Sequence, residues 1–506
     1  MLARRHFLQS AAAGGALLGL GDLSFLSRLR PVSAAEAKLD PKLVRLDNDI
    51  EPLVRLLEET PRDKLLEEVA DRVRKGLNYR DLLAALLLAG VRNVQPRPNV
   101  GFKFHAVLVV NSAHLASQAS PDTDRWLPIF WALDYFKDAQ ARTARESGWR
   151  MLRVDEPNVP ADKAQAIAAF TRAMDAWDER AADAAAAGVA RSCTPDEAFE
   201  LFARYGPRDF RDIGHKAIYV ANSFRTLSAI GWHNAEPVLR SLAYALMKFD
   251  GDANPGTADL APDRPGRLNA ELAGKVRKDW TNGKPDDAAV RRLLATFRTA
   301  GERDAASQVA ELLNANVVPQ SIWDAILCGA GELTMRNPGI VSLHAVTTAN
   351  ALRYAYAASR DESTRVLLML QGASFLPLFR GAPGRGRDVA VDAFEPVVTK
   401  ATGGEAVTEV FDASGTDRMV AASKALAYLS AENAAAKPLI DHARRLVFLK
   451  GNDSHDYKFS SAVLEDHAHL SPTWRNRYLA SSLFLLPTPA ERDNALVERT
   501  RAALFG

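Results

Sequence analysis

Apolar residues recur every three or four positions along most of the chain, which is the spacing that places side chains on one face of an α-helix. The pattern is clear in TPRDKLLEEVADRVRKG (60–76) and in the alanine-rich segment 160–188. Thr60 and Thr194 each precede a proline and a run that ends at glycine, so both are predicted helix N-caps. No segment alternates as a strand does, and no Asn-Gly pair joins two such segments. The sequence predicts an all-α, multi-helical fold.

One stretch interrupts this pattern enough to suggest a linker. It is DGDANPGTADLAPDRPG (250–266), which is rich in proline and glycine. The histidine segments described below lie on both sides of it. We therefore predict one domain over residues 35–506.

The first residues have the features of an export signal. In MLARRHFLQSAAAGGALLGLG, Arg4 and Arg5 precede a weakly apolar stretch, and Val32-Ser33-Ala34 offers a small-residue cleavage site. We interpret residues 1–34 as a twin-arginine signal peptide, with a Sec signal that carries two arginines as the alternative. The expected partner is the twin-arginine export machinery, and the expected location is periplasmic or otherwise extracytoplasmic. The stretch is too short and glycine-rich for a stable membrane span, and no later apolar run is long enough for one.

Charge and cysteine content exclude several classes of function. The 506 residues carry a formal net charge of only +2, which gives no electrostatic case for nucleic acid or an anionic membrane surface. The two cysteines, Cys193 and Cys328, are far apart and exclude a disulfide framework or a cysteine-rich zinc module. The G-x-S-x-G, H-E-x-x-H and phosphate-loop motifs are absent.

Four of the ten histidines stand at the start of helix-like runs of small and apolar residues. The runs are FKFHAVLVVNSAH, DIGHKAIYVANSF, SLHAVTTANALRY and GNDSHDYKFSSAVLED, and their histidines are His105, His215, His344 and His455. These histidines are separated by 110, 129 and 111 residues, a weak fourfold echo. One buried histidine is usually a hydrogen-bonded core residue, whereas four in matching contexts indicate a shared metal site. Imidazole suits iron, copper, zinc and nickel.

Each run also carries a small polar residue about two turns after its histidine, namely Asn111, Asn222, Asn350 and Ser461. At about 100° per residue, Asn111 and Asn350 point away from their histidines, which favours bonding between helices. Asn222 aligns with His215 and could support it as a ligand.

Lys458 lies about 60° from His455 on a helix, so both side chains can face one centre. An ammonium group has no lone pair and cannot bind a metal as it stands, so this lysine would have to lose its proton or be carboxylated. The alternative is that Lys458 extends to solvent or pairs with Asp456 or Glu465, and spacing alone slightly favours that alternative.

In order and in combination, the four segments resemble the questin oxidase-like family, all-α proteins with histidines that open apolar helices and an H-x-x-K motif near the C-terminus. In this chain that motif is His455-Asp456-Tyr457-Lys458. The resemblance spans roughly residues 95–480 and implies helix pairs that close around a central site. It implies a mononuclear non-haem iron bound by His105, His215, His344, His455 and an N-carboxylated Lys458. It also implies an oxygenase-type oxidoreductase that uses dioxygen and a small, aromatic organic substrate. The export signal and the charged Lys216 depart from the family and leave the substrate open.

Residues outside the proposed metal ligands receive secondary roles. His233 is the candidate for proton transfer. The aromatic residues of RWLPIFWALDYF (125–136) have helical spacing, so we expect them in the core rather than against a substrate.

Two other functions stay open from the sequence. A His-Asp phosphohydrolase would use the His455-Asp456 doublet, but it needs a further aspartate on a neighbouring helix. A helical-repeat scaffold that binds protein partners in the periplasm would need no convergence of the four histidines.

Overall fold

The structure is a computed structural model that describes residues 40–96, 102–247, 253–381, 386–432 and 434–506. The predicted signal peptide, residues 1–34, lies outside the described residues. Within them there are 22 α-helices and no strand, and the only β pairing is two isolated bridges. The all-α prediction is therefore confirmed. None of these helices combines the length and the apolar character that crossing a bilayer requires.

The first ten helices and two short 3-10 turns lie between Glu51 and Leu246. They are α2 (Glu51–Glu59), α3 (Arg62–Arg74), α4 (Tyr79–Asn93), α5 (His105–Gln118), α6 (Leu127–Glu146), α7 (Lys163–Ala176), α8 (Glu179–Ser192), α9 (Pro195–Tyr205), α10 (His215–Ile230) and α11 (Ala235–Leu246), with η4 (Glu156–Asn158) and η5 (Trp232–Asn234). A further 3-10 turn, η3 (Phe102–Phe104), leads directly into α5.

The remaining helices follow the proline-rich stretch. They are α12 (Arg264–Ala273), α13 (Asp287–Thr299), α14 (Glu302–Asn314), α15 (Pro319–Arg336), α16 (Ile340–Ala358), α17 (Glu362–Phe379), α18 (Gly403–Ser414), α19 (Arg418–Ser430), α20 (Lys437–Lys450), α21 (Ser454–Asp466), α22 (Pro472–Ser481) and α23 (Ala495–Phe505), with η6 (His467–His469) and η7 (Ser482–Phe484).

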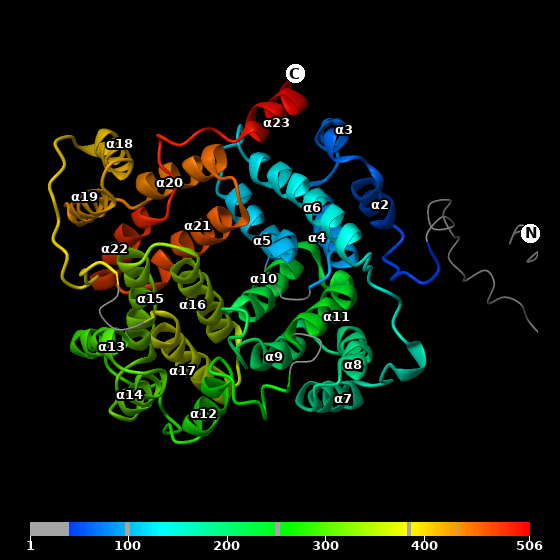
Figure 1. The fold of residues 1–506 in the computed structure, drawn as a ribbon, viewed down its shortest axis with the longest axis horizontal. Helices are drawn as coiled ribbons and strands as arrows, with labels where there is room; N and C mark the ends of the chain where they lie inside the picture. Colours follow the sequence, from blue (N-terminus) through cyan, green and yellow to red (C-terminus); the bar gives the residue numbers. More distant parts are fainter. Residues whose placement is uncertain (1–39, 97–101, 248–252, 382–385, 433) are drawn as a thin grey trace, which may run out of the picture.

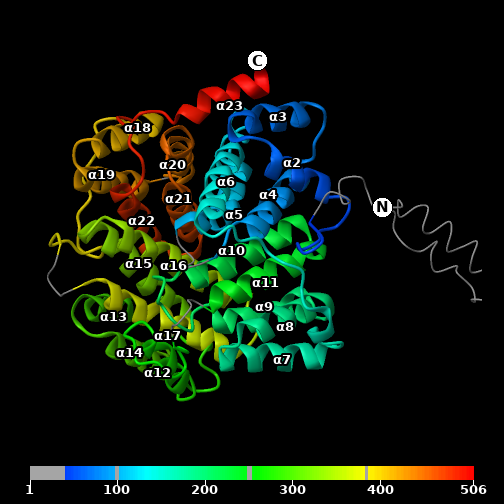
Figure 2. The same ribbon diagram turned by 45° about the vertical axis from the view of Figure 1, so that its right-hand side comes forward.

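Four helices from distant parts of the sequence form a ring in the middle of the molecule. Helix α5 packs against α10, α10 against α16, α16 against α21, and α21 against α5 again (Figure 1). Each ring helix also packs against an outer neighbour: α6 on α5, α11 on α10, α17 on α16 and α20 on α21. Figure 2 shows the outer helices stacked around these four on several sides. Most residues of the four ring helices are buried, and their buried apolar side chains belong to the continuous core.

The predicted helix starts are half right. Thr194 caps α9 with a reciprocal capping box to Glu197, as expected. Thr60 instead ends α2, because its main-chain N–H donates to the carbonyl of Leu56, and α3 begins after Pro61. The N-cap position of α3 belongs to Pro61, whose side chain has no oxygen that could accept from the first turn.

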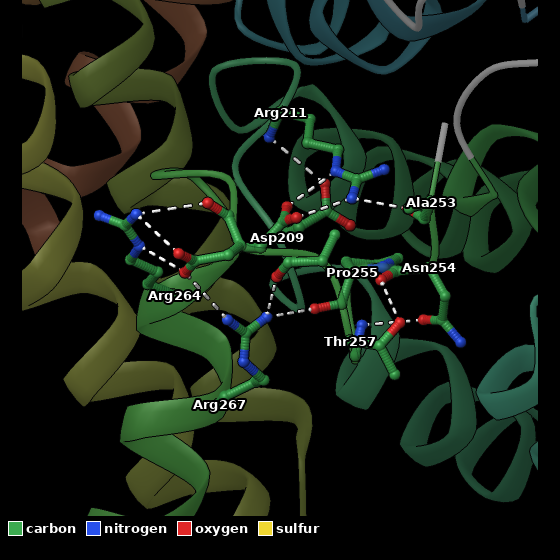
Figure 3. Close-up of polar contacts among 12 residues, drawn as sticks. Asp209, Arg211, Ala253, Asn254, Pro255, Thr257, Arg264 and Arg267 are labelled. Atoms are coloured by element: carbon green, nitrogen blue, oxygen red, sulfur yellow. Dashed lines mark hydrogen bonds and ion pairs between the residues drawn. The ribbon is translucent and has the colours of Figure 1, made fainter. Parts of the chain in front are cut away.

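The proline-rich stretch after Gly251 is fastened to the body of the protein from residue 253 onward. Arg211 donates to the carbonyl of Ala253 and forms an ion pair of 2.7 Å with Asp263, and both charged side chains are buried (Figure 3). Arg267 donates to the carbonyls of Pro255 and Ala258. One continuous apolar core includes buried residues on both sides of this stretch.

Candidate metal centre

The four histidines predicted as ligands all stand near the N-terminal ends of the ring helices. His105 and His215 are the first residues of α5 and α10, His455 is the second residue of α21, and His344 is the fifth residue of α16. Because these four helix starts meet, segments more than a hundred residues apart contribute to one small volume.

Three of the histidines converge on one point. Nε2 of His215 lies 2.8 Å from Nε2 of His105 and 2.9 Å from Nε2 of His344. One ligand nitrogen from each of the three residues lies within 4.8 Å of the others. All three side chains are buried, with 1–5% of their surface exposed.

The outer nitrogens of two rings fix which nitrogen carries the proton. Nδ1 of His215 lies 2.7 Å from the carbonyl oxygen of Asp212, and Nδ1 of His344 lies 2.6 Å from that of Ile340. A carbonyl oxygen only accepts, so each Nδ1 must be the protonated nitrogen of a neutral ring. Both Nε2 atoms then carry lone pairs, and these face each other across 2.9 Å with no proton between them.

Protonating one of these rings would relieve the conflict, but the surroundings oppose it. Burial first, and the charge of Lys458 second, hold the pKa values of His215 and His344 well below their usual range. His105 is shifted the same way for the same two reasons. Besides the Lys458 ammonium group, which lies 3.5 Å from Nε2 of His344, a metal cation is a partner that converging lone pairs accept. Two nitrogens bound at about 2.1 Å and at right angles to one ion would lie about 3 Å apart, so the observed spacing fits.

His455 stands beside this triad but differs from it. Its ring centroid is 4.7 Å from that of His105 and 5.3 Å from that of His344. Its Nε2 atom is buried and has no hydrogen-bond partner among the described residues, whereas Nδ1 lies 3.2 Å from Oδ1 of Asp453. An orphaned buried nitrogen is costly unless something binds it, so this atom also fits a metal ligand.

Lys458 turns inward with the histidines. Its Nζ atom lies 3.5 Å from Nε2 of His344, and 2% of the residue is exposed. The carboxylates weighed as partners are engaged elsewhere: Glu465 pairs with Arg225 at 2.9 Å, and Asp456 accepts the main-chain N–H groups of Asn452 and Asp453. Burial lowers the pKa of Lys458 to about 7, so its neutral, lone-pair form is accessible near neutral pH.

Lys216, the charged neighbour of His215, turns away from the cluster. Its ammonium group forms a buried ion pair with Asp209, at 2.7 and 2.8 Å to the two oxygens. The connection between them includes Gly214, whose φ of +87° is open to glycine but strained for other residues. A Cβ atom there would lie 1.9 Å from Oγ1 of Thr348, so the glycine also lets α10 approach α16.

The small polar residues two turns beyond the histidines join the ring helices to one another. Asn111 donates to Asn222 at 3.4 Å, and Asn222 donates to the carbonyl of Leu108 at 2.9 Å. Asn350 donates to Glu465 and Asp466, and Ser461 to the carbonyl of Ser112. The helix-to-helix role expected for Asn111 and Asn350 agrees with these contacts. Asn222 has the same role and does not support His215.

His233 does not belong to this cluster. It lies in η5, beyond the C-terminal end of α10, and the 16 residues of that helix separate it from His215 by about 24 Å. Its ring is exposed and its Nε2 contacts the side-chain amide of Asn234. The helical rise alone rules out proton transfer between His233 and a ligand at the triad.

The aromatic residues before Phe136 pack in the core, as expected. Trp131 is 4% exposed and stacks on Tyr135 and on Tyr457, with ring centroids 5.1 and 4.4 Å apart. The Asp456 carboxylate, which a phosphohydrolase would direct at a metal, instead completes a capping box at the start of α21.

Sequence reasoning missed Asp453 and the carbonyls of Asp212 and Ile340. Every residue has a main-chain carbonyl, so residue type cannot identify the two that bind histidines. Asp453 could have been recognised, because it is an N-cap type of residue two positions before a histidine. Comparisons with models of known protein families, with curated proteins and with solved structures return no match for this chain.

Proposed function

We propose that this protein binds one transition-metal ion, iron in the first place, through His105, His215 and His344, with His455 and Lys458 completing the site. We propose further that it is an oxygenase-type oxidoreductase that uses dioxygen and a small organic substrate, as the resemblance to questin oxidase-like proteins implies. One observation carries the metal: the Nε2 lone pairs of His215 and His344 face each other at 2.9 Å in a buried site.

Each residue has a separate task in this proposal. A bound iron ion would supply the place where dioxygen is taken up and the electrons that activate it. The Asp212 and Ile340 carbonyls hold the rings of His215 and His344 with Nε2 turned inward, which removes the need to reorganise these two rings on binding. The buried apolar ring around the triad keeps bulk water away from the reacting centre. Lys458 contributes a lone pair when neutral, or an anion if carboxylated as the resemblance implies.

The convergence of histidines also separates this proposal from a protein-binding scaffold. A scaffold gains nothing from burying His215 and His344 with their Nε2 lone pairs facing each other, because a poorly satisfied buried polar group costs about 1–3 kcal/mol. A bound metal ion would offset this free-energy cost.

The test is metal content. We would purify the full chain with its N-terminal segment and compare it with His215→Ala, with His442→Ala as the control. His442 is a histidine of α20 that stacks on Phe411. Inductively coupled plasma mass spectrometry should find about one metal ion per chain in the wild type and in His442→Ala, and none in His215→Ala. Oxygen consumption with a panel of aromatic substrates then tests the reaction. Equal trace metal in all three proteins would contradict the site.

A further inference from the structure

The four histidines are not held equally. His105, His215 and His344 are 4%, 5% and 1% exposed. His455, by contrast, is only partly buried, and 21% of its side-chain surface is exposed. Rotating a triad ring outward would drive it into the packed ring of helices, whereas the His455 ring has solvent on one side. Mobility within this set is therefore expected at His455.

The acceptor that holds Nδ1 of each ring is also less rigid at His455 than at His215 and His344. His215 and His344 are backed by main-chain carbonyls, which are fixed by the backbone. His455 is backed by the side chain of Asp453, which is 62% exposed and can rotate. Oδ1 of Asp453 accepts both the main-chain N–H and the Nδ1–H of His455, at 2.5 and 3.2 Å. If the ring turned away, the main-chain bond that caps α21 would stay in place.

The charge of the site indicates what would take the place of His455. All three triad donors are neutral imidazoles, and no carboxylate belongs to the cluster of metal-ligating groups in the described residues. With Lys458 in its neutral form, a divalent ion in this buried site has only neutral donors and keeps its full positive charge, which favours an anionic partner. The space that one imidazole ring would leave limits that partner to a small molecule or to a projecting group of a larger one.

We propose that His105, His215 and His344 are the permanent ligands, and that His455 is an exchangeable fourth ligand. Asp453 positions it, and its departure opens a place for a small anionic oxygen or nitrogen donor. This inference rests on the proposed function, because it requires that a metal is bound. Asp453 is a positioning residue here, since it acts through His455.

The experiment uses Co²⁺ as a spectroscopic probe of the full-length protein and azide as the small anion. Wild type should bind one Co²⁺. His455→Ala should also bind one, release it to a chelator at least about 10-fold faster, and bind azide about 10-fold more tightly by the shift of its visible bands. His215→Ala should bind no Co²⁺. Circular dichroism checks that each variant is folded, and His455→Gln replaces the alanine variant if that one is not.

Asp453→Asn tests the negative charge behind His455, because asparagine caps a helix as well as aspartate does and its Oδ1 atom can still accept the Nδ1–H group. It should keep one Co²⁺ and release it about 10-fold faster than wild type, with an altered visible spectrum. The control is Asp162→Asn at the cap of α7, which should change neither measurement.

The outcomes distinguish the two proposals. If wild type binds no Co²⁺, the metal site and this inference fall together. If wild type binds one and folded His455→Ala binds none, His455 is a permanent ligand and the inference alone is overturned. It is also overturned if His455→Ala releases Co²⁺ and binds azide as wild type does, because His455 is then not a ligand.

Discussion

Nε2 of His215 lies 2.9 Å from Nε2 of His344, although the Nδ1–H group of each ring already donates to a main-chain carbonyl. Neither nitrogen can donate to the other, so the contact is unfavourable in the protein without metal. This relationship links stability to occupancy of the site.

Replacing His344 with leucine should therefore have opposite effects in the two states. In chelator-treated protein, His344→Leu removes one of the two opposed lone pairs. We expect the free energy of unfolding to stay equal or to rise, by up to about 1 kcal/mol. In protein with excess metal, wild type should be the more stable, because a ligand at 100 times its Kd adds about 2.7 kcal/mol. Urea unfolding with and without metal measures both. A variant less stable than wild type in chelator would show that the contact is favourable without metal.

Gly214→Ala should destabilise the protein and weaken metal binding together. The positive φ costs about 1–2 kcal/mol for a residue with a Cβ atom. The clash with Thr348 adds about 1–3 kcal/mol and displaces the start of α10, which carries His215. Thermal unfolding and metal titration measure the two effects. Gly404→Ala is the control, since a Cβ there meets nothing within 4 Å, and it should be close to neutral.

The buried pair of Lys216 and Asp209 should show strong coupling. Lys216→Met leaves a carboxylate buried without its partner, and we expect a loss of about 3–5 kcal/mol in the free energy of unfolding. The double variant Asp209→Asn, Lys216→Met should lose less than the sum of the two single losses. Lys75→Met breaks an exposed pair with Asp71 and should lose less than about 1 kcal/mol. Additive losses in the buried pair would contradict the ion pair.

Asp466 should make the protein less stable as pH rises toward neutrality. Burial, and then the neighbouring Glu465, raise the pKa of Asp466 to about 7, above the usual 3.8. Between these values the native state holds a proton that the unfolded state has lost, so the free energy of unfolding falls with rising pH, by at most about 1.4 kcal/mol per pH unit. Below about pH 4 both states are protonated and the effect vanishes. Asp466→Asn should flatten the slope between pH 4 and 7 in urea unfolding. If the slope is unchanged in Asp466→Asn, the pH dependence of the free energy of unfolding comes from other groups.

Export should depend on the arginine pair. Arg4→Lys together with Arg5→Lys should keep the protein in the cytoplasm of a bacterial host, because the twin-arginine route reads that pair. Arg28→Lys, beyond the apolar stretch, should leave export intact. Fractionation and immunoblotting of the periplasm provide the measurement. Continued export of the double-lysine variant would favour the Sec alternative.

The fold class and the approach of the histidines could be predicted because both depend on regular spacing. The 3.6-residue period predicts the helices, and the repeated context of His105, His215 and His344 indicates a shared environment. The roles of the polar residues two turns after the histidines could be predicted only in part. The helical angle correctly placed Asn111 and Asn350 away from the centre, but it also suggested that Asn222 supports His215, whereas Asn222 bonds to α5.

The supports of the site could not be predicted, because they depend on irregular backbone. The Asp212 carbonyl reaches His215 only through the conformation of the connection that ends at Gly214, and Lys216 finds Asp209 through the same connection. His233 is a different case. A 16-residue helix separates it from His215, and the helical rise along that helix already implied that the two side chains are far apart.

The ring of α5, α10, α16 and α21 has a consequence for how the protein is made. Chains emerge from the ribosome N-terminus first, and α21 begins only at Ser454. Until that segment is synthesised, three ring helices have no fourth helix to close against, and His105 and His344 lack the neighbour that completes their surroundings. The site therefore assembles only after α21 has been synthesised, and a product truncated before α21 would leave an open bundle in place of a binding site.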